Sequence, residues 1–285
     1  MAEAWRVLVT DSGYKHALAI VRDLGARCEV DTCGPRRLAM AGVSRWTRHN
    51  LRAPSPTDGA RFLSWLDDAV SRYRYDQIIP VGYAACGLLS EHLRRWSPRT
   101  TVVLPPAEAV HRALDKRAMN ALAGAVGVPA PRTAQPATEA GLAAAADKVG
   151  FPLVIKAPLE GQGDVAYVDR PGDLAARYRA YLDRNGWTSP SLPILQQRIS
   201  GPGFGVFATY QDGRLRRIMA HRRVREFPPT GGPSTCAELV DDPALLAAGR
   251  SVLDALAWHG VAMVEFKRHE ADGRYYLMEV NPKFW

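Results

Sequence analysis

Met263-Val-Glu-Phe-Lys267 and Leu277-Met-Glu-Val-Asn-Pro-Lys-Phe-Trp285 are the two stretches of the chain that decide its fold. Both alternate apolar and polar residues, which is the pattern of a β-strand with one buried face. If they pair across the turn Glu270-Ala-Asp-Gly-Arg274, the numbers of facing residues sum to 544. One face of this hairpin is then apolar and belongs to the core, with Val264, Phe266, Met278 and Val280. The other face is a polar floor, made of Glu265, Lys267, Glu279 and Asn281.

In this register the carboxylates of Glu265 and Glu279 lie opposite each other. Like charges in that position destabilise a sheet, so the pair needs a reason. A magnesium ion is one, because it is small, binds oxygen and bridges carboxylates to phosphates. Asn281 would add an amide oxygen on the same face. The alternative is that Lys267 neutralises an exposed acidic pair, and a shift of register by one residue would remove the site.

Residues 1–105 alternate strands and helices, which predicts a parallel α/β unit. The apolar patterns predict strands over 6–10, 28–30, 76–81 and 101–104, and helices over 17–24, 62–73 and 84–93. Pro105-Pro106 then marks a boundary.

The remaining residues predict a helix over 107–126 and further α+β structure. Strands are expected over 151–156, 165–168, 193–199, 205–210, 215–221, 261–268 and 275–281, and helices over 142–149, 172–184 and 244–257. Asp212-Gly213 has the composition of a tight hairpin turn.

Composition narrows the function classes. The 285 residues are 47% hydrophobic, enough for two or three compact units, and no apolar run reaches the length of a membrane span. The start of the chain lacks the features of a signal peptide, so a cytoplasmic protein without a membrane partner is expected. Four cysteines without metal-ligand spacing predict free thiols.

The net charge of +8 favours anionic partners. Six arginines fall within 214–225, which leaves a nucleic-acid-binding surface as an alternative. The stretch has few interleaved aromatic residues and no groove-reading motif, so nucleic acid is not the expected partner.

Several segments together resemble the ATP-grasp superfamily, with an ATP-binding fold like that of carbamoyl phosphate synthase. The terminal hairpin looks like that family's metal-binding end. In order before it come Asp115-Lys116, Phe151-Pro-Leu-Val-Ile-Lys156, the loop Glu160-Gly-Gln-Gly-Asp164 and Leu195-Gln-Gln-Arg-Ile-Ser-Gly201. His221-Arg-Arg-Val-Arg225 and Gly231-Gly-Pro-Ser234 resemble the carboxylate–amine ligase branch in particular.

The resemblance implies a fold and a reaction. A pre-ATP-grasp α/β domain (1–105) would precede a small lid subdomain (106–195) and a large subdomain (196–285), and the last two would sandwich ATP. The substrate carboxylate would take the γ-phosphate of ATP as an acyl phosphate, and an amine, or less often a thiol, would displace phosphate. A non-catalytic or partner-completed ATP-binding protein of the same fold is the alternative.

Site residues follow from the same resemblance. It implies nucleotide contacts from Lys116, Lys156, Gly161, Gly163, Gln196, Gln197 and Ile199. Magnesium, or manganese in its place, would be held by Glu265, Glu279 and Asn281. Arg225 and Arg223 would stabilise the transferring phosphoryl group or grip the substrate carboxylate.

This sequence departs from the family pattern at a few positions. Gln196 stands where many members have glutamate, and Gly203 where some ligases have a ribose-binding carboxylate. Asp164 would repel phosphate unless its side chain turns outward. Related ligases continue past the Asn-Pro strand, so the last domain is expected to be truncated at Trp285 or completed by another subunit, and a homodimer is a further expectation.

Overall fold

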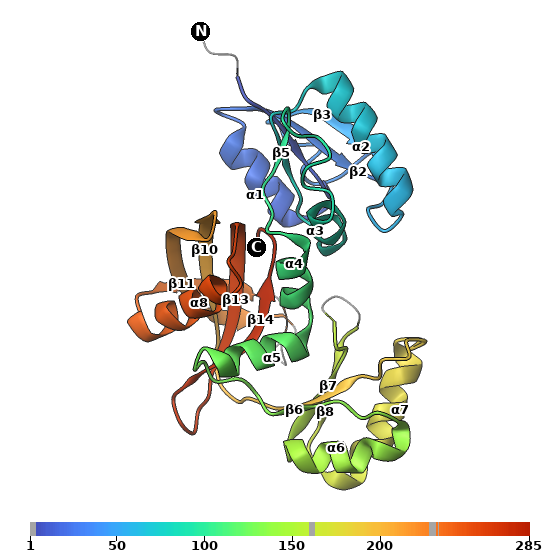
Figure 1. The fold of residues 1–285 in the computed structure, drawn as a ribbon, viewed down its shortest axis with the longest axis vertical. Helices are drawn as coiled ribbons and strands as arrows, with labels where there is room; N and C mark the ends of the chain where they lie inside the picture. The colour runs from blue at the N-terminus through green and yellow to red at the C-terminus, as the bar shows by residue number, and fades with distance from the viewer. Residues whose placement is uncertain (1–3, 160–162, 228–231, 233) are drawn as a thin grey trace.

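The protein is described here by a computed structural model, which covers residues 4–159, 163–227, 232 and 234–285. These residues form three sheets that follow one another along the chain. Figure 1 shows the N-terminal sheet in blue at one end, the C-terminal sheet in orange and red in the middle, and the smallest sheet in green and yellow at the other end. The prediction of a parallel α/β unit followed by two α+β units is confirmed.

The first sheet has five parallel strands in the order β3-β2-β1-β4-β5. The strands are β1 (Arg6–Val9), β2 (Glu29–Gly34), β3 (Thr47–Arg52), β4 (Gln77–Ile79) and β5 (Thr101–Val102), and the helices are α1 (Lys15–Leu24), α2 (Gly59–Tyr73) and α3 (Tyr83–Ser90). Side chains alternate along β1, so Leu8 packs with α2 and α3 whereas Val7 and Val9 pack with α1. Helices therefore cover both faces of the sheet.

The smallest sheet is antiparallel, in the order β6-β9-β7-β8. It contains β6 (Thr133–Ala134), β7 (Leu153–Lys156), β8 (Val165–Val168) and β9 (Ile194–Gln197), with the helices α6 (Leu142–Val149) and α7 (Leu174–Arg184) and two short 3-10 turns at Glu139–Gly141 and Pro171–Asp173. Tyr178 and Tyr181 of α7 are fully buried against this sheet. We call this unit the lid.

The last sheet is antiparallel, in the order β12-β11-β10-β13-β14. Its elements are β10 (Gly203–Gln211), β11 (Arg214–Glu226), β12 (Ser234–Val240), α8 (Pro243–Ala255), β13 (Gly260–Arg268) and β14 (Tyr275–Asn281). Asp212 and Gly213 both have positive φ, 51° and 71°, as the tight turn between β10 and β11 requires. The core face of this sheet packs on α8 and on the helices that precede the lid.

The single helix predicted over 107–126 is wrong, because the chain forms two helices, α4 (Ala107–Leu114) and α5 (Lys116–Ala125). Asp115 breaks the helix: its backbone is extended, with φ −91° and ψ 110°, and forms a bridge to Leu159. Its carboxylate accepts hydrogen bonds from the backbone N–H groups of Arg117 and Ala118 and so caps α5. Both helices contribute to the core of the last sheet, although they precede the lid in sequence.

The register predicted for the terminal hairpin is confirmed at its end and wrong nearer the turn. Val264 pairs with Val280 and Glu265 with Glu279, but a bulge after Glu265 brings Phe266 opposite Leu277. Because the bulge inserts one residue, Leu277 takes the core position and is 1% exposed. Met278 lies on the polar side of the sheet instead of in the core.

The edge strands β3 and β12 were not predicted, nor was the two-residue strand β6, and β11 runs well beyond the predicted 215–221. Each edge strand has one neighbour and carries many exposed polar side chains, so its apolar pattern is weak. Across the described ranges, the longest helix has 15 residues and none has the length and apolarity of a membrane span.

Candidate functional site

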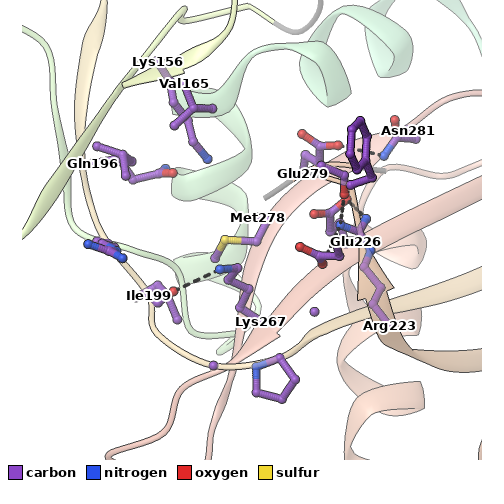
Figure 2. A pocket seen from close by; sticks show the side chains of 18 of the residues that line it. Lys156, Val165, Gln196, Ile199, Arg223, Glu226, Lys267, Met278, Glu279 and Asn281 are labelled. Atoms are coloured by element: carbon purple, nitrogen blue, oxygen red, sulfur yellow. Dashed lines mark hydrogen bonds and ion pairs between the residues drawn. The ribbon is translucent and has the colours of Figure 1, made fainter. Parts of the chain in front are cut away.

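A cavity of about 1060 Å3 lies between the lid and the polar face of the last sheet. The predicted site residues that line it are Lys156, Gln196, Gln197, Ile199, Arg223, Arg225, Glu265, Glu279 and Asn281. Figure 2 shows Lys156, Val165 and Gln196 on the lid side, facing Glu226, Glu279 and Asn281 on the other. Residues far apart in sequence therefore meet around one space, which we call the first cavity.

The floor of the first cavity is the terminal hairpin. Glu265 and Glu279 are direct partners across β13 and β14, and Asn281 follows two residues later on the same face. Asn281 Nδ2 donates to Glu279 Oε1 at 3.1 Å, and Asn281 Oδ1 accepts from the Tyr83 hydroxyl. Tyr83 belongs to α3, so the N-terminal unit contributes to the cavity wall.

Arg223 reaches Glu265 from two strands away. The intervening strand β10 has Gly203 and Gly205 here, and a Cβ on Gly203 would lie 3.0 Å from Arg223 Cδ. The missing side chain opens the passage through which the guanidinium crosses. Arg223 is paired with Glu265, and also with Glu226 at 3.4 Å.

The surroundings of Arg223 favour the charged form of its guanidinium. Its side chain is only 8% exposed, and its Cζ lies 5.6 Å from the centre of the Trp285 ring. Burial lowers the pKa of the guanidinium, but the carboxylates of Glu265 and Glu226 outweigh burial and raise it. Arg223 thus offsets the repulsion between the two facing glutamates.

His221 lies on the same face of the sheet, two residues before Arg223 on β11. The ring is 6% exposed, packs edge-on against Trp285 with centroids 5.2 Å apart, and its Nε2 has no hydrogen-bond partner in the described ranges. Burial, and then the charge of Arg223, lowers its pKa to about 4. His221 is therefore neutral near pH 7.

The donor set of the floor fits a hard divalent cation. Two carboxylates and one amide oxygen share a face, and magnesium prefers oxygen ligands of these types while keeping several waters. In the described part of the chain no three His, Cys, Asp or Glu side chains form a metal cluster by themselves. A cation here would thus need further oxygens from a ligand such as a phosphate.

The lid side offers the cations of Lys156 and Arg198 and several apolar contacts. Lys156 ends β7 opposite Val165 of β8, and both line the cavity together with Val154 and Tyr167. Gln196 is buried, and its Nε2 donates to Thr133 Oγ1 at 3.1 Å. Lys267 Nζ donates to the backbone oxygen of Ile199 at 3.3 Å. This bond holds the segment between β9 and β10 against the floor. Apolar side chains beside a lysine suit a flat ring carrying phosphates.

The other predicted residues either are not among those that line the cavity or lie outside the described residues. Lys116 is 9% exposed at the start of α5, where its backbone N–H donates to Pro158 O at 3.0 Å, and it is not among the lining residues. Gly163 is not among them either, and a Cβ there would lie 2.8 Å from the Tyr181 hydroxyl. Gly161 and Gly231 are outside the described residues.

The side chain of Asp164 turns away from the cavity, so it would not repel a phosphate there. Its carboxylate pairs with Arg184 Nε at 2.9 Å and accepts from Asn185 Nδ2 at 3.0 Å, both at the end of α7. The acidic side chain therefore adds no negative charge to the cavity lining.

Sequence reasoning missed several lining residues. Glu226 follows Arg223 on β11, and an acidic residue beside an arginine-rich strand gave no signal. Met278 was hidden by the bulge, and Tyr83 comes from a different unit. Arg222 of the arginine-rich stretch pairs with Glu238 on β12 at 2.7 Å, and Arg223 is buried.

Comparison with known proteins agrees with this geometry. No family model matches the chain. The chain is 29% identical over 195 residues to the carbamoyl phosphate synthase large chain of Streptomyces avermitilis, covering 64% of this chain and 17% of that protein. It is 27% identical over 180 residues to a D-alanine–D-alanine ligase of Stutzerimonas stutzeri, covering 59% of this chain and 55% of that protein. The matches span well under two thirds of both relatives.

Solved structures match over nearly the whole chain. An L-amino acid ligase from Bacillus licheniformis superposes with a TM-score of 0.75 at 15% identity, covering 99% of this chain and 68% of that one. The chain has the ATP-grasp fold. Another ATP-grasp structure, the biotin carboxylase domain of Hydrogenobacter thermophilus 2-oxoglutarate carboxylase, has a TM-score of 0.74 at 14% identity over 99% of this chain and 65% of that one, and was solved with MgADP.

Proposed function

We propose that the first cavity binds ATP with magnesium and that the protein joins a carboxylate to an amine. The observation that carries the proposal is the pair Glu265 and Glu279, set opposite each other on an ATP-grasp floor and facing Lys156 of the lid. Bound MgATP supplies the phosphoryl group that activates the substrate carboxylate. The ligase branch is favoured by the likeness to a D-alanine–D-alanine ligase and to an L-amino acid ligase.

Each side chain has a task that its position suits. Glu265, Glu279 and Asn281 hold the metal, and Lys156 neutralises phosphate charge from the opposite side. Gln196, Gln197 and Ile199, at the end of β9 and just after it, would contact the nucleotide base. These roles rest on which residues line the cavity and on the chemistry of their donors.

The two arginines have different tasks. Arg223 is committed to Glu265 and Glu226, so it keeps the metal ligands in position. Arg225 is exposed, lines the cavity and forms no ion pair within the described ranges. Arg225 is therefore the guanidinium that meets the substrate carboxylate or the transferring phosphoryl group.

The test is a phosphate-release screen over pairs of carboxylates and amines, run beside a calorimetric titration with MgATP. Release that needs both substrates supports the ligase. Tight MgATP binding without turnover across the panel favours the non-catalytic alternative, and absence of MgATP binding contradicts both.

A further inference from the structure

A second cavity of about 1000 Å3 lies at the carboxyl edge of the N-terminal sheet. Its lining residues come from the loops after four strands and from the opposite wall: 11–14 after β1, 35–36 after β2, 55–57 after β3, 82–84 after β4, and His111, Leu114 and Leu159. The strand order β3-β2-β1-β4-β5 reverses between β1 and β4. Open α/β sheets bind ligands outside the carboxyl ends of their strands at such a reversal.

Asp11 sits at this reversal in an unusual conformation. Its φ is 55°, in the left-handed region that side chains other than glycine rarely adopt. Its Oδ2 accepts hydrogen bonds from the Thr10 hydroxyl and from Gly82 N, the latter at 2.8 Å, which joins the loops after β1 and β4. Conformations of this kind persist where surrounding contacts enforce them and are concentrated at functional sites.

The charges around the second cavity have complementary signs. Asp11 is half-buried in its lining and forms no ion pair with a cation in the described ranges, so its carboxylate can accept an ammonium group. Arg36 is exposed on the same lining and forms no ion pair there either, so it can bind a carboxylate. The Ser12 hydroxyl beside Asp11 is buried and has no hydrogen-bond partner in those ranges.

The rest of the lining is mostly apolar. The apolar surface of the second cavity comes from Tyr14, Pro35, Pro56, Leu114 and Leu159. Exposed apolar area of this kind gains free energy when an aliphatic or aromatic group covers it. An acidic group, a basic group and an apolar wall around one space match the three parts of an α-amino acid with an apolar side chain.

Tyr83 joins this cavity to the first. In the described part of the chain it is the lining residue that the two cavities share. Its hydroxyl donates to Asn281 Oδ1, and Asn281 donates to Glu279. A molecule in the second cavity thus lies one tyrosine away from the proposed metal ligands.

We infer that the second cavity binds an apolar α-amino acid, with its ammonium at Asp11 and its carboxylate at Arg36. The amino-acid site follows from the geometry of the second cavity alone and does not depend on the proposed function. Its role as the site of one ligase substrate rests on the proposed function. Tyr83 would then separate this substrate from the nucleotide.

The experiment measures binding of three probes by calorimetry without nucleotide: L-leucine, isoamylamine, which lacks the carboxylate, and 4-methylpentanoate, which lacks the amine. Arg36→Ala should weaken leucine and 4-methylpentanoate about tenfold, the scale of a lost charged hydrogen bond, and leave isoamylamine unchanged. Arg37→Ala is the matched control, because Arg37 is also exposed and does not line the cavity.

Asp11→Asn should show the reverse selectivity. Asparagine tolerates the left-handed conformation and keeps an acceptor for Gly82 N, so the loop should fold as before. Leucine and isoamylamine should bind about tenfold more weakly and 4-methylpentanoate as in the parent protein. Asp23→Asn, on the exposed side of α1, is the control.

The proposal is overturned if leucine gives no heat up to its solubility limit, or if either variant weakens all three probes equally, as a merely structural role would. Because no nucleotide is present, a failure of MgATP binding would remove the proposed function and leave this result standing. Turnover with other substrates and no leucine binding would remove only the amino-acid site.

Discussion

The two cavities have nearly the same volume, about 1060 and about 1000 Å3, but they are built in opposite ways. The first lies on the face of antiparallel strands and gathers acidic and basic side chains from them. The second lies at the ends of parallel strands and is formed by loops with mostly apolar surface. A strand face repeats every two residues, so the sequence reveals it, whereas loops assemble a site from separate short segments.

The largest effect should come from Glu279, which belongs to the first cavity alone. Glu279→Gln should cost about 3–5 kcal/mol of magnesium-dependent nucleotide affinity, the range for removing one partner from a buried charge contact. Calorimetry with MgATP measures it, and leucine binding in the second cavity should not change.

Glu238→Gln is the control for Glu279, because Glu238 lies on the edge strand β12 and pairs with Arg222 outside the cavity lining. Unchanged MgATP affinity in Glu279→Gln would remove the hairpin from the metal site.

The next effect concerns the stability of the first cavity's floor at low pH. The pKa of His221 is lowered to about 4 in the folded protein, so the unfolded chain takes up a proton first as the pH falls. Stability is fully present above the unfolded pKa and is lost between about pH 6.5 and pH 4, by about 3 kcal/mol for a shift of this size.

His221→Phe keeps an aromatic ring against Trp285 and removes the titration. Urea denaturation at a series of pH values should show a smaller loss of stability in the variant than in the parent protein. Equal losses in both would mean that folding does not lower the pKa of His221.

Three lysines, two in the lid and one on α5, test where the nucleotide site of the first cavity ends. Lys156→Ala should weaken MgATP binding by about 1–3 kcal/mol, whereas Lys148→Ala, exposed on α6, should leave it unchanged. Lys116→Ala is the informative third variant, because Lys116 does not line the cavity. If it weakens MgATP binding as much as Lys156→Ala, the nucleotide extends beyond the cavity described here.

The smallest effect tests the wall between the two cavities. Tyr83→Phe keeps the ring and removes the hydroxyl that donates to Asn281. Magnesium-dependent nucleotide affinity should fall by about 1 kcal/mol, the net contribution of one hydrogen bond. Tyr14→Phe, which changes a tyrosine lining only the second cavity, should have no effect on MgATP. Equal affinities in both variants would show that Tyr83 does not support the metal ligands.

The contrast between strand faces and loops also explains which features of the molecule the sequence predicts. The facing of Glu265 and Glu279 could be predicted because the strands alternate regularly up to that point. Met278 was misplaced because a bulge leaves no mark in an apolar-polar pattern. The break at Asp115 was missed because the apolar positions continue at helical spacing on both sides of the cap.

The second cavity could not be predicted. Asp11, Arg36 and Tyr83 belong to three loops or helix ends, and only the strand order of the folded sheet brings them to one edge. No single segment there carries enough of the site to be recognised. The strands β3 and β12 were missed for a related reason, since each is defined by its one neighbour and not by its own pattern.

The extra residue in β14 has a consequence for the whole hairpin. It lets two adjacent side chains, Met278 and Glu279, turn toward the first cavity while Leu277 and Val280 on either side stay inside. Shortening the strand by that one residue would restore a regular ladder between β13 and β14. In a strand without the bulge, side chains alternate strictly between the two faces. The deletion would therefore leave either Leu277 out of the core or Glu279 off the cavity face.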